Sequence, residues 1–210
     1  MTFESWAVFV PAAFALSLYP GPNNLLALSH GARFGTATAL VAAAGRFPPF
    51  ALFVLGAAIG LGTLITTSAT LFTAFKILGA AYLVWLGWRM LRAGDGLDGT
   101  VEAGPGARLP ALLRREFLTA ITNPKAMLVF TAFLAPFVDP SQPAFGQFVL
   151  LGAAALALEV AAVVIYAVAG ERLGGFARSR GLLGAVNKAS GGLLIAAGAL
   201  LAVASRPATT

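Results

Sequence analysis

The chain has 210 residues, of which 59% are hydrophobic and 10% are charged, and its formal net charge is +6. Soluble domains are about 45–50% apolar and about 25% charged, so this composition excludes a soluble enzyme, a disordered chain and a collagen-like chain. The absence of cysteine excludes disulfides and thiolate metal sites. The basic residues lie in short loops between apolar runs, as orientation in a membrane requires, so the positive charge does not indicate nucleic-acid binding.

Apolar runs near 20 residues long, the length that crosses a bilayer as a helix, recur along the whole sequence. We expect six spans, near residues 5–27, 37–61, 69–91, 113–137, 145–169 and 184–204. The runs are continuous rather than alternating, which argues against a β-barrel. The predicted fold class is therefore all-α, a six-helix transmembrane bundle that forms one integral-membrane domain over residues 1–210.

The loops between the expected spans predict an orientation and an internal repeat. Lys and Arg gather after the first, third and fifth spans, whereas the loops after the second and fourth carry none. Positive charge marks the cytoplasmic side, so both termini are expected outside. A breaker-rich linker at about 94–110 separates three spans (about 1–93) from three more (about 111–205), and an odd number per half predicts two inverted repeats.

Short motifs recur in the same order in both halves, which supports the inverted repeat. One pair of motifs interrupts the first and fourth spans, and the other opens the third and sixth. The pairs are Pro20–Asn24 with Asn123–Lys125, and Lys76–Gly79 with Lys188–Gly191.

The first span contains the sequence Pro20-Gly21-Pro22-Asn23-Asn24. Each proline removes a backbone donor, and a broken helix cannot face lipid, so the break is expected to line protein or a wet cavity. The half-helix that starts here directs a positive dipole end into the membrane, where it can hold a carboxylate. The alternative is a proline kink that only shapes packing.

The fourth span contains Asn123-Pro124-Lys125, which predicts a second break. Pro124 opens the helical ladder, the Asn123 amide can cap an exposed group, and Lys125 brings an ammonium within reach of the same region. The alternative is that Lys125 snorkels to the cytoplasmic interface.

Arg46 and Glu159 are charges inside expected spans two and five. A charge at a helix centre costs about 2.5–3.5 kcal/mol on insertion scales, so each needs a partner or a role. They occupy related positions in the two halves and can pair, bind the two ends of a zwitterion or exchange a proton, although Arg46 can instead snorkel. A substrate or proton role is favoured for Glu159, because only the hypothetical repeat supports pairing. Pro48 and Pro49 are expected to break span two as well.

The small residues of spans two, five and six indicate close helix packing. Gly56 and Gly60 form a GxxxG motif, which leaves a homodimer possible without requiring one.

Three motifs together resemble the LysE/RhtB amino-acid exporter family. They are Pro20-Gly21-Pro22-Asn23, Phe75-Lys76-x-x-Gly79-Ala80-x-Tyr82-Leu83-x-x-Leu86-Gly87, and Phe117-x5-Asn123-Pro124-Lys125-Ala126. The likeness covers essentially the whole chain. It implies export of amino acids or similar metabolites across the bacterial inner (plasma) membrane, driven by a proton or other ion gradient. It also implies that the residues of the two breaks surround the pathway.

The leading hypothesis is a secondary exporter of a small zwitterion, in which Glu159 or amide oxygens take the amine while the half-helix and nearby cations hold the carboxylate. The absence of a P-loop excludes a primary pump. A metal or cation exporter is the alternative, but this sequence has one histidine and, by this interpretation, one acid inside a span. An integral-membrane enzyme is less favoured, because no cluster of His, Asp or Ser is found. We therefore expect no catalytic residue, metal site or cofactor. The expected partners are the substrate, a proton or other coupling ion, and lipid.

Overall fold

The computed structural model describes residues 2–67, 69–92, 108–173 and 180–203, and every regular element in these ranges is a helix. The α-helices are α1 (Phe3–Leu18), α2 (Pro22–Ala43), α3 (Phe47–Thr67), α4 (Ala69–Arg92), α5 (Leu109–Ile121), α6 (Pro124–Leu128), α7 (Ala144–Leu173) and α8 (Arg180–Val203). Three short elements complete the order: the 3₁₀ turns η1 (Ala44–Arg46) and η3 (Ala135–Phe137), and the π-helical segment η2 (Val129–Phe133). The all-α prediction therefore holds for the described chain.

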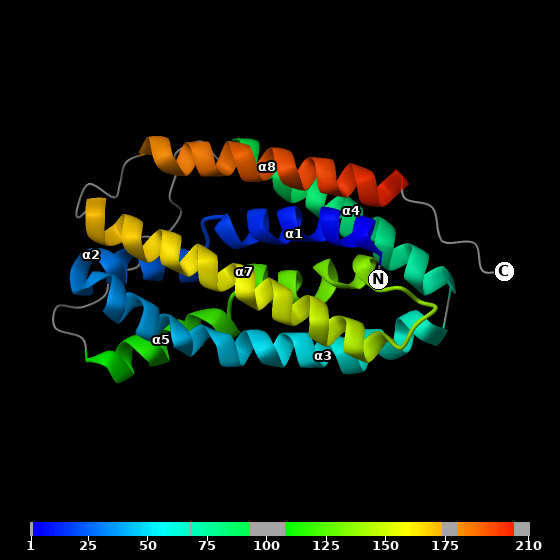
Figure 1. The fold of residues 1–210 in the computed structure, drawn as a ribbon, viewed down its shortest axis with the longest axis horizontal. Helices are drawn as coiled ribbons and strands as arrows, with labels where there is room; N and C mark the ends of the chain where they lie inside the picture. The colour runs from blue at the N-terminus through cyan, green and yellow to red at the C-terminus, as the bar shows by residue number, and fades with distance from the viewer. Residues whose placement is uncertain (1, 68, 93–107, 174–179, 204–210) are drawn as a thin grey trace.

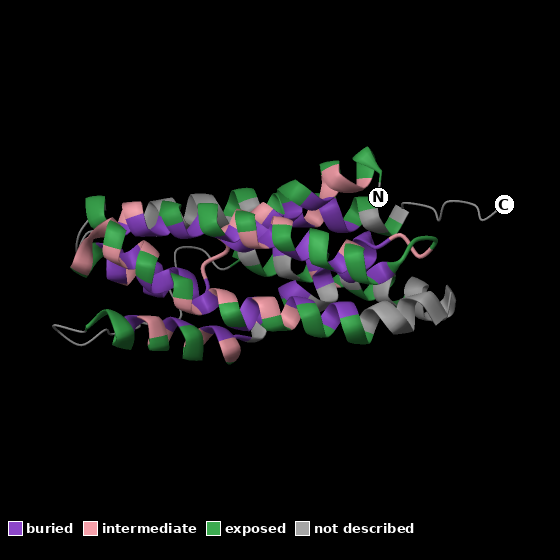
Figure 2. Ribbon diagram, turned by 60° about the horizontal axis from the view of Figure 1, so that its bottom comes forward, coloured by how far each residue is buried: buried purple, intermediate pink, exposed green. Residues whose placement is uncertain are grey.

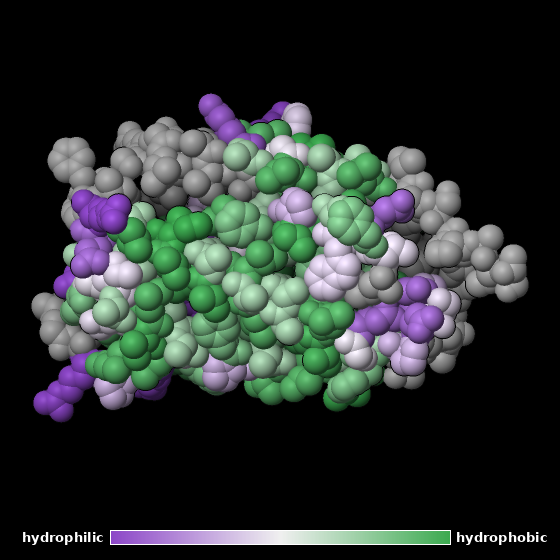
Figure 3. Space-filling model, viewed as in Figure 1, coloured by the Kyte–Doolittle hydropathy of each residue, from purple (hydrophilic) through white to green (hydrophobic). Residues whose placement is uncertain are grey.

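The long helices run roughly along the longest axis of the molecule (Figure 1). Helix α2 packs along α7, α4 packs along α8, and α1 contacts both α7 and α8. Buried residues line the inner faces of the helices, and exposed residues cover the outside (Figure 2). Figure 3 shows apolar side chains over the middle of one face and hydrophilic ones towards its two ends. By length and composition, Pro22–Gly60 and Ala144–Arg172 are able to cross a membrane.

Helix α2 does not end where the sequence suggested. A loop between residues 27 and 37 was expected, but the helix continues from Pro22 to Ala43 and bends at Gly35, whose φ is 81°. Glycine adopts this left-handed conformation without a steric penalty, so one residue makes the turn that a loop was expected to make. The backbone N–H and hydroxyl of Thr36 then donate to the Glu171 carboxylate of α7, which caps the restarted helix.

The other boundaries differ by smaller amounts. Helix α5 begins at Leu109, so the end of the expected 94–110 linker is already helical, and residues 94–107 lie outside the described chain. The prolines at 48 and 49 produce no gap, because the tight turn η1 leads directly into α3. Proline is well tolerated in the first turn of a helix, where its missing N–H has no intrahelical partner.

Close helix crossings are made by glycines, but not by the GxxxG motif. A Cβ on Gly31 would collide with the backbone of Ala167, so α2 and α7 touch through their main chains. Among the described residues, by contrast, no atom lies within 4 Å of a Cβ built on Gly56 or Gly60. The expected close packing at this motif is therefore not observed within the described chain.

Candidate functional site

The first helix break lies between α1 and α2. The side-chain amide of Asn24 donates to the carbonyl oxygens of Ser17 (2.6 Å) and Tyr19 (3.0 Å), and so satisfies the end of α1. Pro22 occupies the first turn of α2, and the capping residue Gly21 has no side chain that could accept a hydrogen bond. The start of α2 therefore lacks the side-chain acceptor that usually caps a helix.

The second break lies between α5 and α6. The Asn123 side chain accepts a hydrogen bond from the Lys125 backbone N–H at 3.0 Å, and so caps α6. Its amide nitrogen donates to Asn23 Oδ1, also at 3.0 Å. Asn123 therefore both closes its own break and joins it to the first one, 100 residues earlier in the chain.

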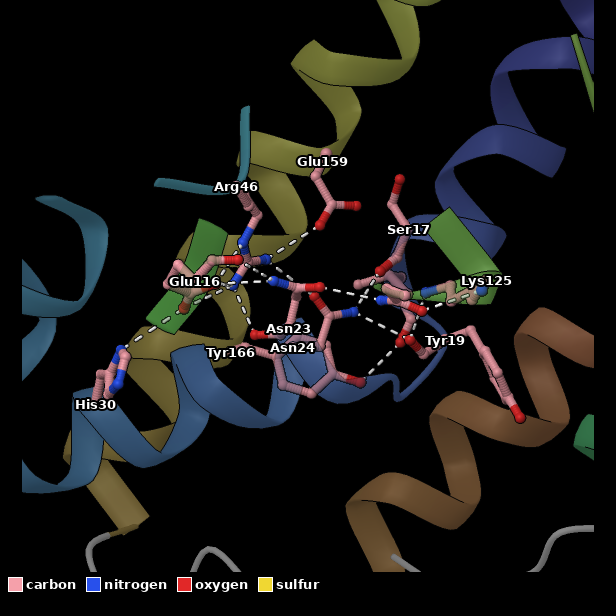
Figure 4. A network of polar contacts seen from close by, with 12 residues as sticks. Ser17, Tyr19, Asn23, Asn24, His30, Arg46, Glu116, Lys125, Glu159 and Tyr166 are labelled. Atoms are coloured by element: carbon pink, nitrogen blue, oxygen red, sulfur yellow. Dashed lines mark hydrogen bonds and ion pairs between the residues drawn. The ribbon is translucent and has the colours of Figure 1, made fainter. Parts of the chain in front are cut away.

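Arg46, at the end of η1, lies at the centre of a buried polar network (Figure 4). Its Nε and Nη2 atoms donate to the two carboxylate oxygens of Glu116, at 3.0 and 3.1 Å. Its Nη1 atom donates to Glu159 Oε1 at 3.1 Å and to Asn24 Oδ1 at 3.4 Å. Nη2 also donates to the Asn23 carbonyl oxygen at 2.6 Å. All five guanidinium donors thus have acceptors.

This geometry bears on the alternatives left open for Arg46 and Glu159. Arg46 is fully buried and forms ion pairs with two acids, so it does not snorkel to an interface. The pairing of Arg46 with Glu159, which was the less favoured alternative, is present, and a role of Glu159 towards the substrate stays a prediction. A buried charge needs such compensation because its desolvation is expensive.

Glu116 was not predicted as a site residue, and the expectation of a single acid within a span was wrong, because Glu116 is also fully buried. Its neighbours Arg114 and Arg115 made this part of the chain resemble a cytoplasmic boundary. The helical spacing could have predicted its burial. Leu112, Glu116 and Ala120 are four residues apart, and all three are buried on one face of α5. The Asn23 amide donates to Glu116 Oε2 at 3.0 Å and holds the carboxylate in place.

A cavity of about 20 Å³ lies where the two breaks meet. Its polar lining comprises Ser17, Asn23, Asn24, Asn123, Lys125 and Glu159. The apolar wall includes Leu16 and the stacked rings of Phe50 and Phe130, whose centroids are 4.7 Å apart. A volume of about 10–15 Å³ accommodates one water molecule, so the site is closed to larger solutes in this conformation.

Lys125 connects the second break to the first. Its Nζ donates to the Tyr19 carbonyl oxygen at 2.8 Å and lies 5.2 Å from the centroid of the Tyr19 ring. Gly21 leaves room for this arrangement, because a Cβ there would lie 3.2 Å from Lys125 Cδ. The side chain thus points towards the first break and lines the cavity (Figure 4).

The structure therefore brings most of the predicted site residues together. The residues that line the cavity are Gly21, Asn23, Asn24, Asn123, Lys125 and Glu159. Arg46 lies behind the cavity wall and is bonded to Asn23, Asn24 and Glu159. The prolines act differently: Pro22 and Pro124 occupy the first turns of α2 and α6, and Pro20 lies in the extended segment before α2. The prolines interrupt the helices, and the adjacent Asn24 and Asn123 form the polar contacts at the breaks.

Comparison with known proteins identifies the family of this chain. Residues 14–205 match the family described as LysE type translocator. The chain belongs to this family. The resemblance inferred from the sequence motifs is thereby confirmed, and the protein is a membrane transporter.

The translocator has relatives of nearly the same length. It is 32% identical to a membrane protein of Vibrio cholerae, over 97% of this chain and 99% of the relative. It is 31% identical to the homoserine/homoserine lactone efflux protein of Salmonella typhimurium, over 97% and 98%. The leucine efflux protein of Klebsiella pneumoniae is 36% identical over 74% of this chain and 73% of its own. No solved structure gives a significant match.

Proposed function

We propose that this translocator exports amino acids and related small zwitterions across the bacterial inner membrane, in exchange for an ion that moves down its gradient. The observation that carries the proposal is the cavity at the two breaks, where Glu159 and Lys125 place opposite charges on the wall of one site. A zwitterion presents the complementary pair of charges. Its transfer into a membrane interior needs both of them to be compensated.

The two ends of the substrate would contact different residues. The ammonium group would bind Glu159 and the amide oxygens of the cavity wall, because carboxylate and amide oxygens accept its hydrogen bonds. The carboxylate would bind Lys125 and the start of α2, where backbone N–H groups and the helix dipole favour an anion. Leu16, Phe50 and Phe130 would contact the substrate side chain.

The names of the relatives support this assignment. Homoserine, homoserine lactone and leucine all carry an amino group, and two of the three carry a free carboxylate. The shared amino group agrees with a site in which an acid, Glu159, is buried beside the cavity. The proposal extends the chemistry of those names to this chain and does not select one amino acid.

Export requires that the cavity open to each side of the membrane in turn, and we assign this movement to two inverted repeats of three spans. The first span would be α1 with α2 up to Gly35, and its counterpart would be α5 with α6, η2 and η3. The direct polar contacts between these two spans include the bond of Asn123 to Asn23 and that of Lys125 to Tyr19. Such contacts would break and re-form as one repeat rocks against the other.

The arrangement of charges supports an orientation with both termini in the periplasm. The beginning of α1 and the end of α8 lie towards the same end of the molecule (Figure 1). Arg33, near the bend in α2, belongs to the other end, where positive charge would mark the cytoplasm. Alkaline phosphatase fused after residue 210 should be active, and a green fluorescent protein at the same place should not fluoresce. The reverse pattern would contradict the orientation.

The binding mode can be tested with purified translocator in liposomes. We expect counterflow of labelled leucine or homoserine that unlabelled leucine inhibits. N-acetyl-leucine lacks the ammonium and leucinamide lacks the carboxylate, so each should inhibit about tenfold or more weakly, a difference of about 1.4 kcal/mol. Glu159→Gln should remove most of the discrimination against N-acetyl-leucine.

The control is Asp139→Asn, which neutralises an acid in the loop before α7, outside the cavity. This variant should discriminate between the analogues as the unmodified translocator does. Equal inhibition by leucine and both analogues would refute the binding mode, and absence of counterflow with a full panel of amino acids would refute the substrate class.

A further inference from the structure

His30 is a buried side chain that the substrate cavity does not use. It lies on α2, seven residues after Asn23, and is fully buried. Among the described residues, neither of its ring nitrogens has a hydrogen-bond partner. Its Nδ1 atom lies 3.6 Å from Glu116 Oε1, just beyond hydrogen-bonding distance (Figure 4). Buried polar atoms are usually paired, so an unpaired imidazole facing a carboxyl group calls for an explanation.

Glu116 and His30 lie behind the cavity wall. Neither residue lines the cavity, and Arg46 stands between Glu116 and Glu159 (Figure 4). Seven residues of α-helix correspond to about 10 Å along the axis, which places His30 between the first break and the basic end marked by Arg33. The pair is thus outside the substrate site and nearer to the proposed cytoplasmic end.

The charges around Arg46 are unequal. Two carboxylates, Glu116 and Glu159, share a single guanidinium, while the ammonium of Lys125 is bonded to Tyr19 instead. An excess buried negative charge is unfavourable, so this cluster favours one additional positive charge. A substrate ammonium at Glu159 can provide it, and so can a proton at Glu116. The two are therefore alternatives that neutralise the same charge.

The chemistry favours a proton over a metal cation. The Arg46 guanidinium, whose Nη2 is 2.9 Å from Glu116 Oε2, repels any cation placed beside that carboxyl group. In the described part of the chain, no group of three or more His, Cys, Asp or Glu side chains could hold a metal ion. A proton, by contrast, needs only the carboxyl oxygen and the imidazole nitrogen that face each other.

We infer that Glu116 and His30 form a proton-binding site outside the substrate cavity, and that proton binding there and substrate binding at Glu159 exclude each other. This inference rests on the proposed export function. In the proton-transfer step, the O–H bond of protonated Glu116 breaks and the proton moves from Oε1 to His30 Nδ1. The products are a carboxylate and an imidazolium, and the imidazolium then loses its Nε2 proton to water as the basic end opens.

The surroundings of His30 support release in that direction. The charged and titratable groups around His30 include Glu116 and Arg115 of α5, Arg46 of η1, Arg33 of α2, and Glu159 and Tyr166 of α7. Three of these are cations, and they oppose a lasting charge on the imidazole. The imidazolium is therefore a transient carrier, and the Tyr166 hydroxyl is already bonded to the Leu18 carbonyl oxygen at 2.7 Å.

The decisive experiment compares substrate exchange with proton coupling in liposomes. His30→Asn should keep leucine counterflow at equal pH within about threefold of the unmodified translocator. Glu116→Gln holds the carboxyl site permanently neutral, as a bound proton would, and should therefore weaken leucine counterflow. In both variants, uptake or efflux driven by a pH gradient should fall about tenfold or more, a range typical of coupling between two ligands. Tyr166→Phe, which removes a buried hydroxyl but no proton carrier, should reduce both activities in the same proportion.

Two measurements keep the inference testable if a variant folds poorly or leucine is not the substrate. In weakly buffered detergent solution, leucine binding to the unmodified protein should release a proton that a pH indicator detects. Infrared difference spectra, without any substrate, should show a protonated carboxyl band that titrates with pH and disappears in Glu116→Gln.

Exchange or binding that occurs without proton release, or full pH-gradient coupling in His30→Asn, would overturn this inference and leave the exporter proposal standing. Lack of a titrating carboxyl band would also overturn it. A failure of all exchange would count against the exporter proposal, and the infrared band alone would then decide the proton site.

Discussion

The breaks before α2 and before α6 both contain proline and asparagine, but the asparagine side chains form different hydrogen bonds in the two breaks. Asn24 follows the first break and donates backwards, to the carbonyl oxygens of Ser17 and Tyr19 at the end of α1. Asn123 precedes the second helix and accepts from the backbone N–H of Lys125, at the start of α6. The first asparagine therefore satisfies acceptors, and the second satisfies a donor.

This difference leaves the two helix starts unequal. The start of α6 is capped by a side chain, whereas the start of α2 has Gly21 in the capping position and no side-chain acceptor. If the halves are inverted repeats, their backbone paths are similar, but only the start of α2 leaves its backbone N–H groups without a side-chain cap. In the proposed binding mode, the start of α2 would bind the substrate carboxylate. The second break contributes Asn123 and Lys125, which bond to the first break.

Replacement of Arg46 should cause the largest loss of stability, because Arg46 is bonded to the first break through Asn23 and Asn24. Arg46→Met leaves two buried carboxylates without their cation and should reduce the free energy of unfolding by about 3–5 kcal/mol. Thermal unfolding in detergent, followed by circular dichroism, measures the loss. Arg89→Met removes an exposed cation that lies over Trp85, and it should have little effect. Similar losses in both variants would show that the network does not stabilise the first break.

Removing each asparagine compares the two breaks directly. Asn24→Ala leaves the Ser17 carbonyl oxygen and one Arg46 donor without partners, so we expect a loss of about 2–4 kcal/mol. Asn123→Ala loses a helix cap and its bond to Asn23, for an expected loss of about 1–2 kcal/mol. Chemical denaturation of both variants in the same detergent measures the order. Equal losses would mean that the breaks are closed equivalently.

Lys125→Gln tests whether the second break contributes a binding charge to the first. We expect the apparent affinity for leucine to fall about tenfold, because the carboxylate loses an ammonium partner. The affinity for leucinamide, which has no carboxylate, should stay unchanged. Lys188→Gln on α8, an exposed position, serves as the matched control. An equal effect on leucine and leucinamide would assign Lys125 to structure rather than to the substrate.

The smallest change in stability is expected for Asp139, in the loop that follows the second break. At the corresponding point after the first break, α2 bends at Gly35 instead of ending in a loop. Hydrogen bonds from the Ser141 hydroxyl and backbone N–H lower the pKa of Asp139 below its ordinary value. A group with a lowered folded-state pKa stabilises the protein above its unfolded-state pKa, and that contribution disappears as the pH falls through the folded-state pKa.

Unfolding temperatures measured between neutral pH and about pH 3 should therefore show an acid-dependent loss that Asp139→Asn lacks. The difference should stay below about 1 kcal/mol, because the group is largely open to solvent. Identical pH profiles for the two proteins would contradict the expected contribution of this loop.

Local chemistry explains what could be predicted about this fold. Proline removes a donor wherever it occurs, so Pro20, Pro22 and Pro124 specify two helix interruptions without reference to the rest of the chain. A charge within an apolar run can also be recognised locally, because its desolvation is costly wherever it lies. Arg46 and Glu159 were therefore predicted to need compensation. The bend at Gly35 was not predicted, because a glycine near the end of an apolar run also fits an ordinary loop.

The sequence by itself determined that the chain is helical and apolar, where its helices break, and which charges must be compensated inside it, since these follow from backbone chemistry and the cost of desolvation. Only the tertiary structure decided that Glu116 and Glu159 share one guanidinium, that Asn123 reaches Asn23, and that His30 faces a carboxyl group. These contacts join residues about 70 to 113 positions apart. Their partners are selected by how helices pack against one another, and that selection leaves no local pattern in the chain.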